Sequence, residues 1–171
     1  HYLGPVIVND ISGGTLDDRM FETIAEMNVP YVLMHIQGTP QDMQKNPHYE
    51  DVVREVYDFL AERIKRLNDL GFDKIIVDQG FGFGKTVAHN YQLMDKMEIF
   101  LELGYPLLVG VSRKSMICRL LDVTPQEALN GTTVLNTVSL LKGANILRVH
   151  DVREAVEAIR IVDAMHFRSI E

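Results

Sequence analysis

The chain has 171 residues, 46% of them hydrophobic, which is enough to bury the core of one domain. Its net charge of −7 provides no basic surface for nucleic acid, and its single cysteine, Cys118, excludes an internal disulfide and a cysteine-based metal cluster. No export signal and no apolar run of about 18 residues is present. We therefore expect one cytoplasmic domain over residues 1–171 that binds neither nucleic acid nor membrane.

Short apolar runs along the chain predict five β-strands. Each run is aliphatic or β-branched and continuous rather than alternating, which is typical of parallel strands buried on both faces. Because strand-like residues begin almost at once, and because the chain does not start with Met, we expect a fragment or a processed chain. The predicted strands are Val6–Asn9, Tyr31–His35, Lys74–Asp78, Leu107–Val111 and Asn145–Val149.

Helical periodicity follows the second and third predicted strands. Pro47 suits the first turn of a helix, and apolar residues recur at spacings of three and four from Val52 to Leu67, until Gly71 ends the run. A second run with this spacing covers residues 93–101. Both patterns predict amphipathic helices that pack one face on a sheet.

The last third of the chain predicts further helices. Thr124-Pro-Gln-Glu127 is typical of a capping box with Pro at the first helical position. Gly131 is expected to interrupt that helix, and a second apolar stretch runs from residue 134 to 141. Asp151 is predicted to be the N-cap of the final helix.

Five βα units require a parallel sheet with covered faces. A complete eight-unit barrel takes about 250 residues, so the chain corresponds to about five-eighths of one. A self-contained, doubly wound sheet of five strands is the alternative, and periodicity alone does not separate the two. In either fold the carboxyl ends of the strands carry the chemistry, so polar residues at these ends are expected to line one pocket.

The loop after the third predicted strand, Gln79-Gly-Phe-Gly-Phe-Gly-Lys85, resembles a phosphate-binding loop but matches neither common pattern. A Walker loop needs glycine at position 79, and a dinucleotide loop starting at Gly80 needs glycine at position 85. Alternating Gly and Phe favour a sharp turn that presents Phe81 and Phe83 to a planar aromatic ligand. The alternative is a tight turn with both rings in the core. Lys85 is expected to start a helix and point to solvent.

Two polar residues close predicted strands and suit a heteroaromatic ring. Asp78 ends an apolar strand, where a carboxylate is costly unless it is paired. It could accept two hydrogen bonds from an N–C–N edge such as that of a pterin or guanine, and Asn9 could bind the same ring. The alternatives are an N-cap or ion pair for Asp78 and turn chemistry for Asn9. Met34 either covers the flat ligand or packs in the core.

Two further strand ends suit an anion. Ser112-Arg113-Lys114-Ser115 lies where a strand meets a helix, so its backbone N–H groups and basic side chains favour a negative ligand. Arg148 and His150 are two residues apart on the last predicted strand, so their side chains point to the same side. Because Arg binds phosphate through two parallel hydrogen bonds, this pair suits a diphosphate. A purely structural role for the pair is the alternative.

The order of these motifs resembles that of the dihydropteroate synthase family. The resemblance extends from Val6 to the last helix and implies a (β/α)8 TIM barrel of the pterin-binding kind, an α/β fold of which this chain would hold strands four to eight. The matching runs are Asn9-Asp-Ile-Ser-Gly13, Met34-His-Ile-Gln-Gly38, Asp78-Gln-Gly-Phe-Gly-Phe-Gly-Lys85, Gly110-Val-Ser-Arg-Lys-Ser115 and Lys142-Gly-Ala-Asn-Ile-Leu-Arg-Val-His-Asp-Val152.

The resemblance implies a step of folate biosynthesis, in which 6-hydroxymethyl-7,8-dihydropterin diphosphate and p-aminobenzoate condense to 7,8-dihydropteroate and diphosphate. Asp78 would stabilise positive charge on the pterin as the C–O bond breaks, and a cationic pair would stabilise the departing diphosphate. The residues carried over by position are Asn9, Met34, Asp78 and Lys114 for the pterin, Phe83, Lys114 and Ser115 for the p-aminobenzoate pocket that sulfonamides also occupy, and Arg148 and His150 for diphosphate. Of these, Asp78, Lys114, Arg148 and His150 are the expected catalytic residues.

Two departures from the family pattern stand out. Gln79 replaces the usual proline, and the first three βα units are missing. The missing units would carry the Asn that binds Mg²⁺, a Ser-Thr-Arg-Pro loop at the p-aminobenzoate pocket, and an Asp of the third strand. We therefore expect Mg²⁺ as cofactor with its ligand upstream, no metal ligand within this chain, a homodimer, and activity only in a longer protein.

Two other functions stay open. A pterin-dependent methyltransferase domain would explain Asn9 and Asp78, but it has no use for a diphosphate clamp at Arg148 and His150. A non-catalytic remnant that binds pterin or phosphate is the second alternative. Release of diphosphate would distinguish an enzyme from such a binding module.

Overall fold

The structure is a computed structural model and describes residues 4–166. Its five strands form a single parallel sheet in the order β1-β2-β3-β4-β5. All five predicted strands are present, each shorter than expected because the inter-strand hydrogen bonds stop where the chain leaves the sheet. Their bounds are β1 Val8–Asp10, β2 Tyr31–Met34, β3 Ile75–Asp78, β4 Leu107–Val109 and β5 Ile146–Leu147.

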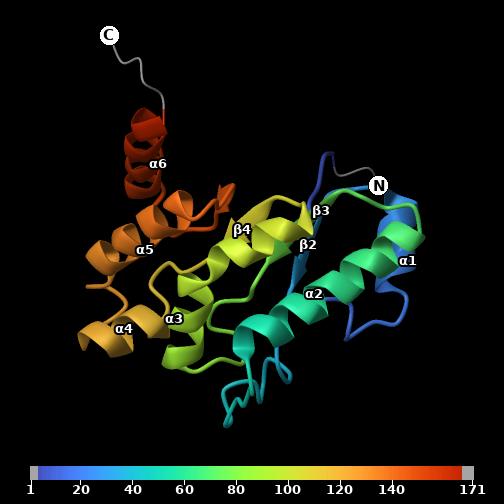
Figure 1. Ribbon diagram of the computed structural model, residues 1–171, viewed down its shortest axis with the longest axis horizontal. Coiled ribbons are helices and arrows are strands. Elements are labelled where there is room, and N and C mark those ends of the chain that lie inside the picture. Colours follow the sequence, from blue (N-terminus) through green and yellow to red (C-terminus); the bar gives the residue numbers. More distant parts are fainter. Residues whose placement is uncertain (1–3, 167–171) are drawn as a thin grey trace.

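The helices follow the strands in chain order across the molecule, from α1 at one end to α5 near the other, with α6 beyond it (Figure 1). Sequential parallel strands joined by right-handed crossovers place their helices on one face of the sheet. A doubly wound sheet would reverse its strand order, so the barrel alternative is the one observed. The bounds are α1 Met20–Met27, α2 Val52–Asp69, α3 Val87–Asp95, the 3-10 helix η1 Met97–Leu103, α4 Ser115–Leu121, α5 Leu129–Leu141 and α6 Val152–His166.

Alternate strand residues divide between two faces. Tyr31, Leu33 and Val77 belong to the hydrophobic core shared with the helices. Their neighbours project to the opposite side because the side-chain period of a strand is two. We call this second side the open face. By register and alternation it carries Asn9, Val32, Met34, Ile76, Asp78, Leu108, Ile146 and Arg148.

Two helix starts differ from the prediction. α2 begins at Val52 rather than near Pro47, because the Asp51 carboxylate accepts hydrogen bonds from the N–H groups of Val53 and Arg54, both at 3.1 Å. Thr124 and Glu127 do bond, with Thr124 Oγ1 donating to Glu127 Oε2 at 2.7 Å. They close a turn, however, and α5 starts only at Leu129.

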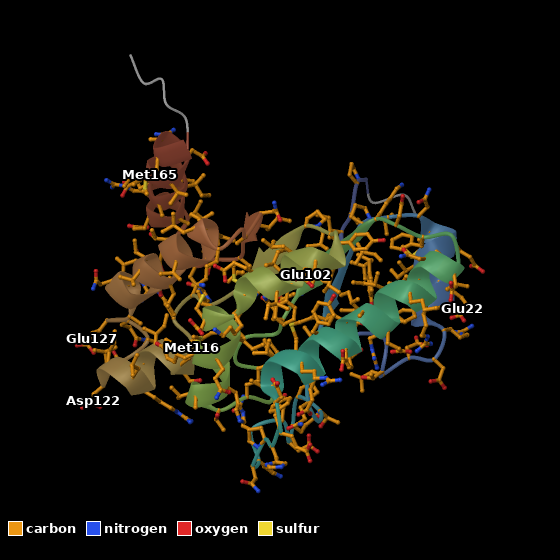
Figure 2. The ribbon with its side chains drawn as sticks, viewed as in Figure 1. Glu22, Glu102, Met116, Asp122, Glu127 and Met165 are labelled. Carbon is orange, nitrogen blue, oxygen red and sulfur yellow. The ribbon has the colours of Figure 1, made fainter. Side chains whose placement is uncertain are left out.

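Gly131 does not interrupt the helix as expected. It lies inside α5, where a Cβ atom would stand 2.5 Å from Cγ2 of Ile117 in α4. The glycine therefore allows α4 and α5 to approach closely. Nearby, Met116 of α4 is fully buried where this helix approaches α3 (Figure 2). The expected single helix over residues 93–101 is instead the end of α3 followed by η1, and α1 was not predicted.

None of the helices within residues 4–166 combines the length and the hydrophobicity needed to cross a bilayer.

Candidate functional site

The site lies on the open face at the carboxyl ends of β2, β3, β4 and β5. Met34 of β2 is the register partner of Asp78 in β3, and Asp78 is in turn the partner of Leu108 in β4. A Cβ atom at Gly110 would lie 3.7 Å from Cβ of Arg148 and 3.9 Å from Nζ of Lys114. Gly110 therefore lies next to both Arg148 and Lys114, which brings two cationic side chains to the same part of the open face.

Asp78 is the central acid of this group and is only 7% exposed. Burial raises the pKa of its carboxyl, while the N–H of Gly80, donated to Oδ1 at 2.7 Å, and the positive charges of Lys114, Lys85 and Arg148 act in the opposite direction. Within residues 4–166 it forms no salt bridge and caps no helix. A ligand that brings N–H donors would therefore stabilise the carboxylate.

Lys114 and Phe83 form the second part of the site. Lys114 Nζ donates to the carbonyl oxygen of Phe81 and lies 4.8 Å from the centre of the Phe83 ring. Burial lowers the pKa of Lys114 to about 8, although the Asp78 charge raises it. Ser115 is exposed at the start of α4. A flat ring with an anionic group would fit the chemistry of these three side chains.

Only one of the two predicted rings is available at the mouth of the site. Phe83 is partly buried beside Lys114, but Phe81 is completely buried in the hydrophobic core. Both outcomes expected for this loop are therefore half correct. The loop turns through positive φ angles at Gly80, Gly82 and Gly84, of 70°, 80° and 62°, and this alternation directs the two rings differently.

Lys85 was expected to point to solvent, and this prediction is wrong. Its side chain is 3% exposed, donates to the carbonyl oxygens of Gly80 and Phe83 at 3.0 Å each, and lies 2.9 Å from Nδ1 of His35. Thr86, not Lys85, is the N-cap of α3. Burial lowers the pKa of Lys85 to about 7, partly offset by the Asp78 charge. The lysine closes the glycine-rich loop from inside.

The expected anion site at Ser112–Ser115 needs a correction at Arg113. Its guanidinium binds both oxygens of Asp151, with Nε at 2.9 Å from Oδ2 and Nη2 at 2.7 Å from Oδ1. It also donates to the carbonyl oxygens of Pro125 and Gln126. The Arg113 guanidinium is therefore occupied by structural contacts, and it holds the Asp151 carboxylate just before α6.

Arg148 and His150 are both exposed, on the last strand and just after it. The Arg148 backbone N–H donates to the Val109 carbonyl at 2.9 Å, which extends the β4–β5 ladder beyond Leu147. Among the described residues no hydrogen bond or salt bridge holds the Arg148 guanidinium, whereas His150 contacts Ser112. The pair thus presents a fork-shaped cation and an imidazole at one edge of the site.

Asn9 and Met34 share the open face but differ in depth. Met34 is buried at the level of Asp78. Asn9 is exposed and pairs with Val32, two residues before Met34 along the strand direction. The neighbouring Asp10 is buried on the helix side and accepts hydrogen bonds from Ser12, Gly14 and Tyr31, which makes it a turn residue.

A family model described as "Pterin binding enzyme" matches residues 1–150 of the chain. The chain belongs to this family. Its similarity to known proteins extends over nearly all of its own length but over only part of theirs. It is 44% identical over 164 residues to the dihydropteroate synthase of Escherichia coli, covering 95% of this chain and 58% of that protein.

Solved structures confirm the predicted fold class of this chain. The dihydropteroate synthase of Yersinia pestis with a sulfonamide drug complex aligns with a TM-score of 0.90 and 41% identity, over 95% of this chain and 60% of that one. The Xanthomonas albilineans enzyme in complex with 7,8-dihydropteroate aligns with a TM-score of 0.86 and 36% identity, over 95% of this chain and 60% of that one. The chain thus contains five βα units of the pterin-binding (β/α)8 barrel.

Sequence reasoning gave no individual role to two residues beside the candidate site, His35 and Ser112, although both belong to the quoted motifs. Burial and the Lys85 charge depress the pKa of His35 far below its ordinary value, so the ring is neutral and can accept the lysine N–H. Ser112 follows β4 and contacts the His150 ring. Each residue lies within a motif, but its contact is with a partner 50 or 38 positions away.

No group of three His, Cys, Asp or Glu side chains in residues 4–166 is arranged to hold a metal ion.

Proposed function

We propose that the complete protein containing this chain is a dihydropteroate synthase, which joins 6-hydroxymethyl-7,8-dihydropterin diphosphate to p-aminobenzoate and releases diphosphate. The chain spans 58% of the length of the Escherichia coli relative, so the proposal concerns the longer protein. The observation that carries it is the open-face site itself. The carboxyl of Asp78 is buried within reach of the positive charges of Lys114 and Arg148, and no acceptor among residues 4–166 holds the Arg148 guanidinium.

The pterin half of the substrate would bind at Asp78, Lys114, Met34 and Asn9. The carboxylate can accept two hydrogen bonds from N–H groups on the ring edge. Because burial has removed water from the carboxylate, these charge-assisted bonds would supply the donors that it lacks. Met34 lies on the same face at the same level and offers an apolar surface for the ring. Asn9, farther along the open face, would contact another part of the ring.

The p-aminobenzoate half would lie against Phe83, Lys114 and Ser115. The ring of Phe83 provides a stacking partner, and the Lys114 ammonium beside it attracts a carboxylate. Ser115 is the first residue of α4, where hydroxyl and backbone N–H groups are available to an anion. A sulfonamide combines a similar aromatic ring with a polar group, which agrees with the drug complex of the Yersinia pestis relative.

The diphosphate would be held by Arg148 and His150. Because no acceptor within residues 4–166 holds the Arg148 guanidinium, it can give two parallel N–H bonds to phosphate oxygens. As the pterin methylene–oxygen bond breaks, its electrons leave with the diphosphate oxygen, and these donors stabilise the growing negative charge. Asp78 stabilises the positive charge that develops on the pterin. The amine nitrogen of p-aminobenzoate then bonds to the methylene and loses a proton.

Magnesium, a homodimer and a cytoplasmic location belong to this proposal. The described residues supply no metal site, so magnesium would need ligands from outside them. Exposed apolar side chains on α5 and α6, among them Val134, Ile161 and Met165, support a self-associating surface (Figure 2). The single free Cys118 suits a reducing compartment.

The test is formation of dihydropteroate and diphosphate by the complete protein, compared between the Arg148→Ala and Arg160→Ala variants. Arg160 is an exposed arginine of α6 and serves as the matched control. Arg148→Ala should weaken binding of diphosphate and of the pterin diphosphate, and leave a pterin without phosphate nearly unaffected. Arg148→Lys should recover only part of the loss, because an ammonium lacks the fork geometry. Equal losses for both pterins would show that Arg148 is structural.

A methyltransferase is disfavoured by this same exposed pair, because methyl transfer to a corrinoid releases no diphosphate. A non-catalytic binding module would bind pterin diphosphate in the same way but release no diphosphate in the assay above. Methyl transfer, or binding of pterin diphosphate without release of diphosphate, would overturn the proposed reaction.

A further inference from the structure

Ser112 lies beneath His150, and no role for it follows from the proposed substrate contacts. Its side chain is 3% exposed. The His150 backbone N–H donates to Ser112 Oγ at 3.2 Å, and Nδ1 of the His150 ring lies 2.9 Å from the same oxygen. One buried hydroxyl thus contacts both the backbone and the ring of the histidine.

The hydrogen of the Ser112 hydroxyl can be placed by elimination. A serine hydroxyl donates one hydrogen bond and accepts up to two. The oxygen accepts the His150 backbone N–H, so its own hydrogen needs an acceptor, because buried donors are almost always paired. Among the described residues, Nδ1 of His150 is the only acceptor within hydrogen-bonding distance of this hydroxyl. The reverse arrangement, with Nδ1 donating, would leave the hydroxyl hydrogen buried and unpaired.

We infer that Ser112 is a positioning residue that sets the tautomer of His150, so that the neutral ring carries its hydrogen on Nε2 and donates it to the leaving diphosphate. Nε2 is separated from Nδ1 by Cε1, so its N–H bond diverges from the contact between Nδ1 and Ser112 and is not used by that contact. An uncharged His150 is then already a donor, and binding requires no proton uptake by its ring. The last clause of the inference rests on the proposed function; the tautomer itself does not.

The surrounding contacts hold Ser112 and His150 next to each other. Arg113, the next residue, binds Asp151, the residue after His150, through two hydrogen bonds of 2.9 and 2.7 Å. The Arg113 backbone N–H also donates to Thr132 Oγ1 at 3.0 Å. Two adjacent pairs therefore join the β4–α4 turn to the β5–α6 turn. This double link holds the His150 ring at a fixed distance from the Lys114 side of the site.

The inference is tested by ¹⁵N NMR of histidine-labelled complete protein, with His150 assigned by its loss in His150→Gln. The ring of neutral His150 should show a protonated Nε2 and an unprotonated Nδ1. Ser112→Ala should give a mixture of tautomers. Ser112→Thr retains a hydroxyl and should restore the Nε2–H form. A protonated Nδ1 in the unaltered protein, or an unchanged tautomer in Ser112→Ala, would overturn the inference whatever the protein catalyses.

Binding supplies the second readout. Titration with inorganic diphosphate should give roughly 2- to 10-fold weaker affinity for Ser112→Ala, the range of one ordinary hydrogen bond, with a pterin lacking phosphate unaffected. Ser139→Ala is the control, since it also removes a buried hydroxyl, which donates to the Leu135 carbonyl in α5, far along the chain from the site. It should change neither the tautomer nor the affinity.

The two parts of the inference can fail separately. If Ser112→Ala changes the tautomer but diphosphate binds the unaltered protein and the variant equally, the donor role of His150 is overturned. If diphosphate does not bind the unaltered protein at all, the proposed function fails while the tautomer assignment stands.

Discussion

At the scale of single residues, Asp78 is a buried acid whose ionisation lowers the stability of the folded state. Burial raises its pKa, so between its ordinary pKa and the raised value the folded state binds more protons than the unfolded state. Stability contributed by this group is therefore present at low pH and decreases as the pH rises through that window. Burial thus opposes ionisation of Asp78, which suits a residue whose charge a ligand's N–H donors would stabilise.

The first prediction is that Asp78→Asn weakens pterin binding in the complete protein without weakening the fold. The expected loss is about 1.5–3 kcal/mol, the typical contribution of a hydrogen bond to a charged group. The isosteric amide removes the buried charge, so the denaturation midpoint at pH 7 should stay the same or increase. Calorimetry with a pterin analogue and urea denaturation measure the two effects. An unchanged affinity would remove Asp78 from the site.

Gln79, the next residue, is an uncharged polar side chain that is buried without hydrogen bonds to the described residues. Its side chain is completely buried, and neither its Oε1 nor its Nε2 has a hydrogen-bond partner among the described residues. We predict that Gln79→Met, which keeps the length and removes both polar atoms, stabilises the protein by about 1–3 kcal/mol. Gln92→Met on the exposed face of α3 is the control and should give no gain. A loss of stability in denaturant would show that Gln79 is paired in solution.

At the scale of elements, the glycine-rich loop after β3 depends on Lys85. Its ammonium has three hydrogens and meets three acceptors, two of them loop carbonyls and the third Nδ1 of His35 at the end of β2. The loop carries Phe83, whose ring borders Lys114. Its shape is therefore set by a side chain at its own end.

We predict that Lys85→Met raises the KM for p-aminobenzoate and weakens sulfonamide binding more than it affects the pterin. The reason is that Phe83 loses its fixed position while Asp78 keeps its Gly80 hydrogen bond. Because two buried carbonyls lose their donor, unfolding should also become easier. Lys45→Met, on an exposed loop, is the control. Steady-state kinetics on both substrates would contradict the prediction if the two KM values increased equally.

His35 gives the same element a pH dependence. Its folded pKa is depressed by burial and by Lys85, whereas an unfolded histidine titrates near its ordinary value of about 6.5. Below that pH the unfolded state binds more protons, so stability is complete above about pH 6.5 and falls as the pH is lowered. Urea midpoints between pH 5 and 7.5 should decline less steeply for His35→Gln. Parallel curves for the two proteins would exclude this contribution.

At the scale of the whole molecule, both outer strands have only one neighbour. Within residues 4–166, β1 pairs only with β2 and β5 only with β4, so both edges present backbone groups that no described strand pairs. The open face is equally incomplete, because Asn9 and Arg148 at its two ends are exposed. In a closed barrel these edges would pair with the remaining strands.

We therefore predict that the 171-residue chain by itself is marginally stable, associates through its edges, and forms no dihydropteroate even with magnesium and both substrates. Sedimentation and product assays on this chain measure both properties, with the complete protein as the positive control. A monomer with full turnover would show that the five described units are sufficient.

The sequence by itself determined the parallel sheet, the positions of its five strands and the placement of Asp78 and Arg148 toward the carboxyl ends of their strands. These features depend on apolar runs and on the two-residue alternation of side chains, which are properties of neighbours along the chain. The family resemblance was likewise visible in the order of the motifs, and the match to the pterin-binding family confirms it.

Only the tertiary structure decided which basic and aromatic residues reach the site. Lys85 turns inward because three glycines with positive φ curl its loop, and Arg113 turns away because Asp151 and two carbonyls lie within reach. Gly131 lies inside a helix because Ile117 of α4 occupies the space that a side chain at position 131 would need. Each outcome depends on atoms distant in sequence, whose positions no local pattern encodes, and so the contacts of a side chain become predictable only once the chain is folded.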